Sequence, residues 1–165
     1  MIGFAGPAFM FVGFAAGIVA GGVVLALLSA RTPKLGALML VGAVNGVIFT
    51  LTGHFFWTFI VLVFLGLVAD LILWKSSHPA RVFPLAYGVF SMWCAAPFIP
   101  LVINSEAYFD DISAQMGQEY ASAMAEIFRP WVVGVIAVVA LLVGILAGRL
   151  GVKVGRKHFE SAGLL

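Results

Sequence analysis

The residues of this chain that could do chemistry are few, and most stand alone among apolar neighbours. His54 closes the segment Thr52-Gly53-His54 and precedes three aromatic residues. A neutral imidazole at such a turn can cap a helix, bind a small ligand or coordinate a metal. Cys94, the single cysteine, can fill core space as a small apolar side chain, or its thiolate can ligate a soft metal or haem iron. His54 and Cys94 are therefore the two candidate ligands of a metal or of haem iron.

A second group of candidates surrounds two prolines. Pro97 and Pro100 remove backbone hydrogen bonds from one apolar segment, and the freed carbonyls need partners or a water-lined cavity. A broken helix at membrane depth is typical of a binding site. The aromatic, polar and sulfur side chains around this break and around the histidine turn are the candidate substrate-binding residues: His54, Trp57, Tyr87, Trp93, Cys94, Asn104 and Tyr108. The 15 phenylalanines can line a slot for a flat apolar ligand or simply fill a helical bundle.

Motifs of soluble catalysis are missing from the sequence. It contains no P-loop, no His-Glu-x-x-His and no Gly-x-Ser-x-Gly. We therefore expect no enzymatic activity, and a separate subunit would have to hydrolyse any ATP. Asp70 is an isolated acid at membrane depth, and we interpret it as pairing with Lys75 or Arg81 or contacting a partner subunit.

Composition identifies the class of protein that must position these residues. Of the 165 residues, 63% are hydrophobic and 10% are charged, whereas a soluble domain has about 25% charged residues. Such a chain is predicted to be a single-domain, all-α integral membrane protein lying in the lipid bilayer. The net charge of +2 is too small for nucleic-acid binding, and one cysteine excludes a disulfide framework.

Charge-free stretches predict the spanning helices, each of which needs about 17–25 apolar residues. We predict five spans, a helix of the outer loop and a cytoplasmic tail: spans 8–30, 36–52, 55–74, 83–103 and 130–149, outer helix 105–128, tail 150–165.

Basic residues predict the orientation. Eight of the nine follow the first, third or fifth span: Arg31, Lys34, Lys75, Arg81, Arg149, Lys153, Arg156 and Lys157. The positive-inside rule places these segments in the cytoplasm of a bacterial cell and the 104–129 loop outside. That loop has five of the seven acids and an apolar residue at every fourth position from Tyr108 to Phe128. We expect an amphipathic helix that either caps the bundle or closes over a binding site.

Small residues recur at four-residue spacing along several predicted spans. Gly42 and Gly46 form one such pair, and Gly144 and Gly148 form another. The longest row lies on the first span and comprises Gly13, Ala16, Gly17, Ala20 and Gly21. These faces allow close helix contacts, either within the bundle or, for the longest row, with another membrane subunit.

Several stretches form a recognisable signature when they are taken together. They are Leu51-Thr52-Gly53-His54, Gly66-Leu67-Val68-Ala69-Asp70-Leu71-Ile72, Tyr87-Gly88-Val89-Phe90-Ser91-Met92-Trp93 with Pro97 and Pro100, Glu106-Ala107-Tyr108-Phe109, Gly117-Gln118-Glu119-Tyr120, Trp131, and Lys157-His158-Phe159-Glu160-Ser161-Ala162-Gly163. In these stretches the chain resembles the MptD-like (Trep_Strep) family over nearly its whole length. This family comprises proposed substrate-binding S components of energy-coupling factor (ECF) transporters.

The resemblance implies a role in micronutrient uptake. An S component binds a small molecule at its outer face, docks on an EcfT-like membrane coupling subunit that carries two cytoplasmic ATPases, and topples to release the substrate inside. Such components usually have six helices, whereas we predict five, and the first of these corresponds to the family's second.

Three functions remain open from the sequence. The leading specific hypothesis is an S component for haem, held as transported substrate rather than as an intrinsic cofactor. The second is an S component for a metal-free vitamin or its precursor. The third, of a different class, is a structural or assembly subunit that binds no ligand of its own.

Overall fold

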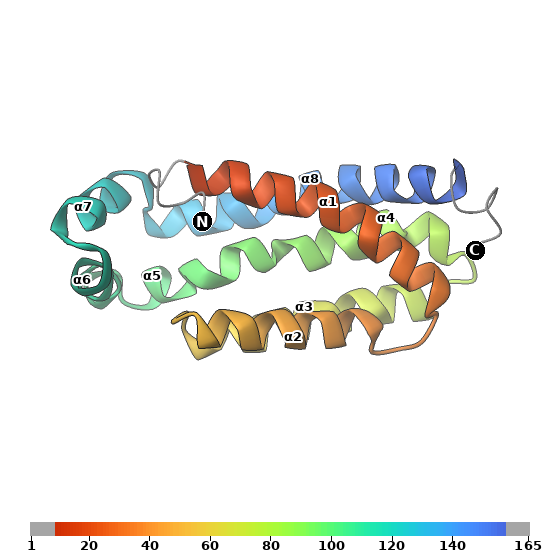
Figure 1. The fold of residues 1–165 in the computed structure, drawn as a ribbon, viewed down its shortest axis with the longest axis horizontal. Coiled ribbons are helices and arrows are strands. Elements are labelled where there is room, and N and C mark those ends of the chain that lie inside the picture. Colours follow the sequence, from red (N-terminus) through yellow and green to blue (C-terminus); the bar gives the residue numbers. More distant parts are fainter. Residues whose placement is uncertain (1–8, 158–165) are drawn as a thin grey trace.

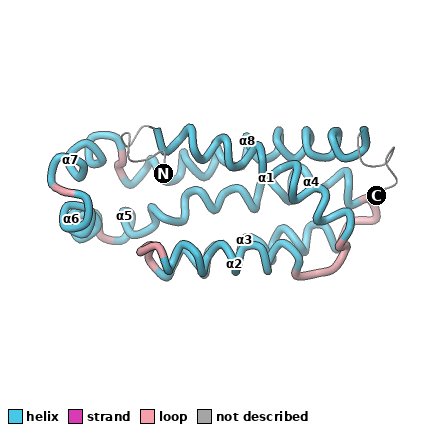
Figure 2. The backbone as a smooth tube through the Cα atoms, viewed as in Figure 1, coloured by secondary structure: helices cyan, strands magenta, loops and turns pink. Residues whose placement is uncertain are grey.

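The computed structural model describes residues 9–157, and within this range every regular element is helical (Figures 1 and 2). The elements in chain order are α1 (Phe9–Arg31), α2 (Ala37–Leu51), α3 (Phe56–Trp74), α4 (Pro79–Ser91), the 3-10 helix η2 (Met92–Phe98), α5 (Ile99–Ile103), α6 (Ser105–Met116), α7 (Gln118–Ile127) and α8 (Pro130–Gly155). The predicted all-α fold is thereby confirmed. Position 8 of the first predicted span and positions 158–165 of the predicted tail lie outside the described residues.

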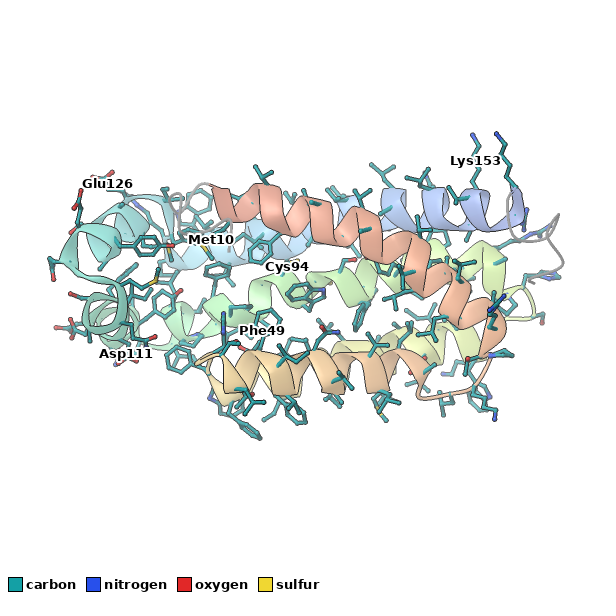
Figure 3. The ribbon with its side chains drawn as sticks, viewed as in Figure 1. Met10, Phe49, Cys94, Asp111, Glu126 and Lys153 are labelled. Atoms are coloured by element: carbon teal, nitrogen blue, oxygen red, sulfur yellow. The ribbon has the colours of Figure 1, made fainter. Side chains whose placement is uncertain are left out.

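The long elements run side by side and alternate in direction along the long axis of the molecule (Figure 1). The 31–36 and 75–78 loops meet at one end, which we call the basic end. Helices α6 and α7 cover the other end, which we call the acidic end. Figure 3 shows Asp111 and Glu126 at the acidic end and Lys153 at the opposite end. The arrangement therefore separates the two kinds of charge along the bundle as the sequence predicts.

Within residues 9–157, four helical segments are long and apolar enough to cross a membrane: Met10–Arg31, Phe56–Trp74, Pro79–Ile103 and Pro130–Gly155. The predicted span 36–52 is the exception, because α2 has only 15 residues and is therefore roughly 22 Å long at 1.5 Å per residue. Glycines at positive φ limit the length of α2. Gly36 (φ 100°) precedes its first residue, and Gly53 (φ 89°) lies in the turn after its last. Helix α8 is longer than predicted. It continues to Gly155, six residues beyond the predicted end at 149, because Arg149 and Lys153 can extend their charges toward water without ending the helix.

The fourth span is irregular where the two prolines predict it to be. Regular α-helix ends at Ser91, a 3-10 segment follows from Met92 to Phe98, and α5 resumes only for Ile99–Ile103. The 3-10 segment lies deep in the bundle, and Cys94, Ala96 and Phe98 are each 1% exposed. The break therefore lies in the core of the protein rather than on its lipid-facing surface.

Helices α2 and α3 form a tightly packed antiparallel hairpin. A Cβ atom on Gly42 would overlap the backbone carbonyl of Leu62, and one on Gly66 would lie 2.6 Å from the carbonyl oxygen of Leu38. Only glycine permits this approach of the two backbones. The Gly144–Gly148 face of α8 packs similarly on α4. Gly46 also faces α3, since its Cβ would lie 2.9 Å from the Phe59 Cα. Internal packing is therefore confirmed for the predicted pairs Gly42/Gly46 and Gly144/Gly148.

Asp70 joins this hairpin at the basic end. Its Oδ2 accepts hydrogen bonds from the backbone N–H groups of Gly36 (3.0 Å) and Met39 (2.9 Å), and its Oδ1 accepts one from Leu38 (3.1 Å). The predicted pairing of Asp70 with Lys75 or Arg81 is wrong. The start of α2 offers N–H groups that lack partners within the helix, and a carboxylate is favourable at that positive end of the helix dipole.

Candidate functional site

Two short helices, α6 and α7, cover the acidic end in place of the single predicted helix 105–128, and we call them the cap. The helix is interrupted at Gly117, whose φ of 90° an L-residue rarely adopts. Asn104 starts α6, because its side-chain oxygen accepts a hydrogen bond from the Ala107 N–H at 3.2 Å. Of the predicted apolar row, Tyr108, Met124 and Phe128 are buried, whereas Met116 is 42% exposed. The acidic side chains of these helices remain exposed.

Aromatic rings from five segments meet beneath this cap. The ring centroid of Trp93 lies 5.4 Å from that of Phe49 and 6.1 Å from that of Phe14. Phe98 lies 6.2 Å from Phe14 and stacks on Phe128 at 4.7 Å. We call this group the aromatic cluster, and its members are Phe11, Phe14, Phe49, His54, Trp93, Phe98 and Phe128. Each such pair contributes about 0.5–1.5 kcal/mol beyond its buried area, so the cluster holds α1, α2, η2 and the end of the cap together.

His54 lies at the edge of the aromatic cluster. Its ring packs edge-on against Phe49 with centroids 4.8 Å apart, and its Nδ1 lies 3.4 Å from the Thr52 hydroxyl. Burial lowers the pKa of His54 below its ordinary 6.5, and a hydrogen bond to the Phe49 backbone opposes this shift only in part. The imidazole is therefore neutral near pH 7 and keeps a ring nitrogen that can accept a proton, a hydrogen bond or a metal.

Two tyrosines fasten the cap to the bundle. The ring of Tyr108 lies 6.4 Å from that of Phe55, next to the histidine turn. The Tyr120 hydroxyl donates to the Met10 Sδ at 3.8 Å, so α7 is tied to α1. Burial raises the pKa of Tyr108 to about 12 and also raises that of Tyr120. Both hydroxyls therefore stay protonated and can act as donors.

A cavity of about 200 Å³ lies against the aromatic cluster between α1, η2 and α8. Phe11, Phe14 and Cys94 contribute to its wall, and aliphatic side chains of α8 complete it. Apart from the Cys94 thiol, its lining is wholly apolar. Pockets for drug-sized ligands measure about 300–1,000 Å³, so this cavity accommodates only a small apolar group, and its lining residues Val135 and Val139 are exposed on the outer surface of α8.

The structure divides the predicted substrate-binding residues into two sets. His54, Trp93, Cys94 and Tyr108 gather around the cluster and its cap. Tyr87 instead has a structural contact, because its hydroxyl donates to the Ile18 carbonyl at 2.6 Å and its ring stacks on Phe83. The Asn104 side chain instead accepts a hydrogen bond at the N-terminus of α6.

Trp57 also lies outside the cluster, because its side chain on α3 is 57% exposed. Trp131 at the start of α8 is similarly 65% exposed. Exposed tryptophans near the ends of spanning helices anchor a protein at the membrane interface. This anchoring accounts for the position of Trp57 better than substrate contact does.

Sequence reasoning missed the phenylalanines of the cluster. Fifteen phenylalanines are spread along the chain, and no short spacing distinguishes Phe14, Phe49 and Phe98 from those that face lipid. Their shared site depends on which faces of α1, α2 and η2 turn inward, which only the helix packing determines.

Possible metal ligands are sparse. Among residues 9–157, no group of three or more His, Cys, Asp or Glu side chains could hold an ion. The predicted candidates His54 and Cys94 lie in different surroundings, one at the turn and the other 1% exposed in the wall of the apolar cavity.

The predicted docking row on α1 is split between two environments. Ala16, Gly17 and Ala20 are exposed, and a Cβ atom on Gly17 would meet open space. Gly21 faces inward instead, because its Cβ would lie 2.6 Å from the Tyr87 hydroxyl, and Gly13 is partly covered. The unpartnered part of the row is therefore Ala16, Gly17 and Ala20.

The spanning helices, the aromatic cluster and the cap define an all-α integral membrane protein with an aromatic cluster at its acidic end. The chain belongs to the Trep_Strep family, described as hypothetical bacterial integral membrane proteins, and the family model matches residues 1–161. Comparisons with curated proteins and with solved structures give no match.

Proposed function

We propose that this protein is the substrate-binding S component of an ECF-type importer and that it binds a small micronutrient at the acidic end. The observation that carries the proposal is the aromatic cluster, which lies under the amphipathic cap and adjoins a cavity between α1, η2 and α8. Rings from α1, α2 and η2 offer flat apolar faces, and His54 and Tyr108 add polar groups at the edge. A concave apolar site with few polar groups is the usual form of a small-molecule site.

The cap acts as the lid of this site. Helices α6 and α7 meet at Gly117, and only glycine accommodates its backbone conformation without strain. The contacts of the lid with the bundle include ring packing and a weak hydrogen bond to sulfur. Lifting it exposes the cluster to the acidic side, which the positive-inside rule makes the cell exterior.

The partners in this proposal are a membrane coupling subunit and two cytoplasmic ATPases. The exposed Ala16, Gly17 and Ala20 face of α1 allows a second helix to approach closely. The chain itself is not an enzyme in this scheme, because ATP hydrolysis belongs to the separate ATPase subunits.

A metal-free vitamin or precursor suits the site better than haem. The cavity measures about 200 Å³, below the usual range for drug-sized ligands, and haem would fit only with the cluster rearranged. An axial ligand would come from His54 at the turn or from the buried Cys94 thiol, and a ligand without metal needs neither.

The test is to purify the chain in detergent and to identify copurifying small molecules by mass spectrometry. We expect a bound ring compound at near one per protein, reduced about tenfold in Trp93→Leu, which removes one of the stacking faces. Trp57→Leu is the matched control and should retain the ligand. A Soret band on haemin addition, lost in His54→Ala or Cys94→Ala, would restore haem. Absence of any ligand would instead support the structural subunit.

A further inference from the structure

A larger cavity, of about 450 Å³, lies at the basic end, away from the proposed substrate site. It opens where α1, α3 and α8 end and where α2 and α4 begin. Its volume falls within the range of about 300–1,000 Å³ typical of small-molecule sites. Nothing in the proposed transport function uses it.

Cationic and hydroxyl groups form one part of the wall. Lys34 and Arg156 both line the cavity and are exposed at its margin. The Ser29 Oγ, also in the lining, is buried and has no hydrogen-bond partner among the described residues. A buried hydroxyl without a partner costs about 1–3 kcal/mol, so rotation of the Ser29 side chain toward an acceptor in the cavity would remove this cost.

Apolar side chains form the rest of the wall. Leu27, Leu73 and Phe83 line the cavity, and the lining Trp74 is 66% exposed at the end of α3. An exposed tryptophan at a helix end lies at the level of the lipid headgroups. The cavity thus offers an apolar surface and a cationic margin at the depth where a lipid has its glycerol and its phosphate.

Asp70 is the acid in the lining, and its charge restricts where an anion can lie. Both carboxylate oxygens already accept hydrogen bonds from the first turn of α2, at 2.9–3.1 Å. The positive end of that helix offsets the carboxylate charge locally. An anion is therefore favoured at the margin with Lys34 and Arg156 rather than next to Asp70.

We propose that this cavity binds the phosphate headgroup of an anionic phospholipid. Lys34 and Arg156 pair with the phosphate, and the Ser29 hydroxyl rotates toward the cavity and donates a hydrogen bond to the headgroup. Leu73, Phe83 and Trp74 contact the glycerol and the start of the acyl chains. Basic pockets between spanning helices are known to recognise such headgroups. A lipid held there would stabilise the junction of five helix ends.

Native mass spectrometry of the chain in nanodiscs of phosphatidylglycerol and phosphatidylcholine tests this site. We expect one retained phosphatidylglycerol per chain, and in Lys34→Gln/Arg156→Gln we expect its apparent affinity to fall roughly 30-fold, because each basic side chain contributes a factor of about five. The matched control Arg149→Gln/Lys153→Gln removes the same charge from α8 at residues that do not line the cavity, and it should retain the lipid.

A second variant tests the cavity itself. Ala30→Trp fills space at a lining position that is exposed, so the fold should tolerate it while the lipid is excluded. Equal loss in the two charge variants, equal retention of both lipids by the unmodified chain, or displacement of the lipid by excess inorganic phosphate would overturn the proposal.

Discussion

At the scale of single residues, the two polar side chains with the most definite surroundings are Asp70 and His54. Asp70 is 3% exposed and satisfies three backbone N–H groups of another helix. His54 combines a half-buried ring with a lowered pKa. The surroundings of each side chain lead to a prediction that a stability measurement can check.

Replacing Asp70 by alanine should destabilise the protein by about 2–4 kcal/mol, because three N–H groups at the start of α2 lose their acceptor inside the bundle. Thermal unfolding in detergent measures the change. Asp110→Ala is the control, since this acid is exposed on α6 and its loss should be nearly neutral. Equal melting temperatures for the two variants would contradict the capping role.

His54 should make stability depend on pH. The folded-state pKa is lowered below 6.5, so the unfolded chain binds protons more readily, and stability rises with pH. This contribution is fully present above pH 6.5 and is lost as the pH falls through the interval between the two pKa values. In His54→Gln the melting temperature should change less over that interval. An unchanged slope would show that other groups control the acid response.

At the scale of elements, the helix contacts divide the glycines into those under a neighbouring backbone and those in open space. Gly66→Leu should cost about 3 kcal/mol, at the upper end of overpacking costs, because Leu38 and Met39 of α2 lie against it. Gly17→Leu should leave stability unchanged, since nothing lies within 4 Å. Unfolding of both variants in detergent gives the comparison, and similar losses would exclude the packing explanation.

The Gly17→Leu variant also tests the proposed docking face. Because its fold should be intact, any loss of copurification with a coupling subunit would come from the added side chain on α1. Retention of the coupling subunit at the level of the unmodified chain would place the contact elsewhere.

The elements also show how far the sequence could be interpreted. Charge-free runs of apolar residues located all the long helices, because lipid forces such runs to form helices. Gly117 is a lone glycine within an amphipathic pattern, and the spacing of that pattern continues across it, so the two cap helices could not be distinguished from one. The sequence predicts that Asp70 pairs with nearby cations, because sequence distance alone cannot show that the start of α2 packs beside it.

At the scale of the whole molecule, the two ends differ in charge, and this makes the topology testable. In a Cys94→Ser background, Asp111→Cys should react with a membrane-impermeant maleimide in intact cells, whereas Ser77→Cys should react only after permeabilisation. Both positions are exposed: Ser77 lies in the loop between α3 and α4 at the basic end, and Asp111 lies at the acidic end (Figure 3). The reverse pattern would place the lid in the cytoplasm and contradict import from the acidic side.

The helices of this bundle are unequal in length. Helix α8 has 26 residues and α2 has 15, which correspond to roughly 39 Å and 22 Å. A bilayer of about 30 Å is therefore spanned with length to spare by α8 and is not fully spanned by α2. A short helix of this kind is accommodated by local thinning of the bilayer or by flanking residues that extend to the interface. We therefore expect the bilayer to be thinnest beside α2.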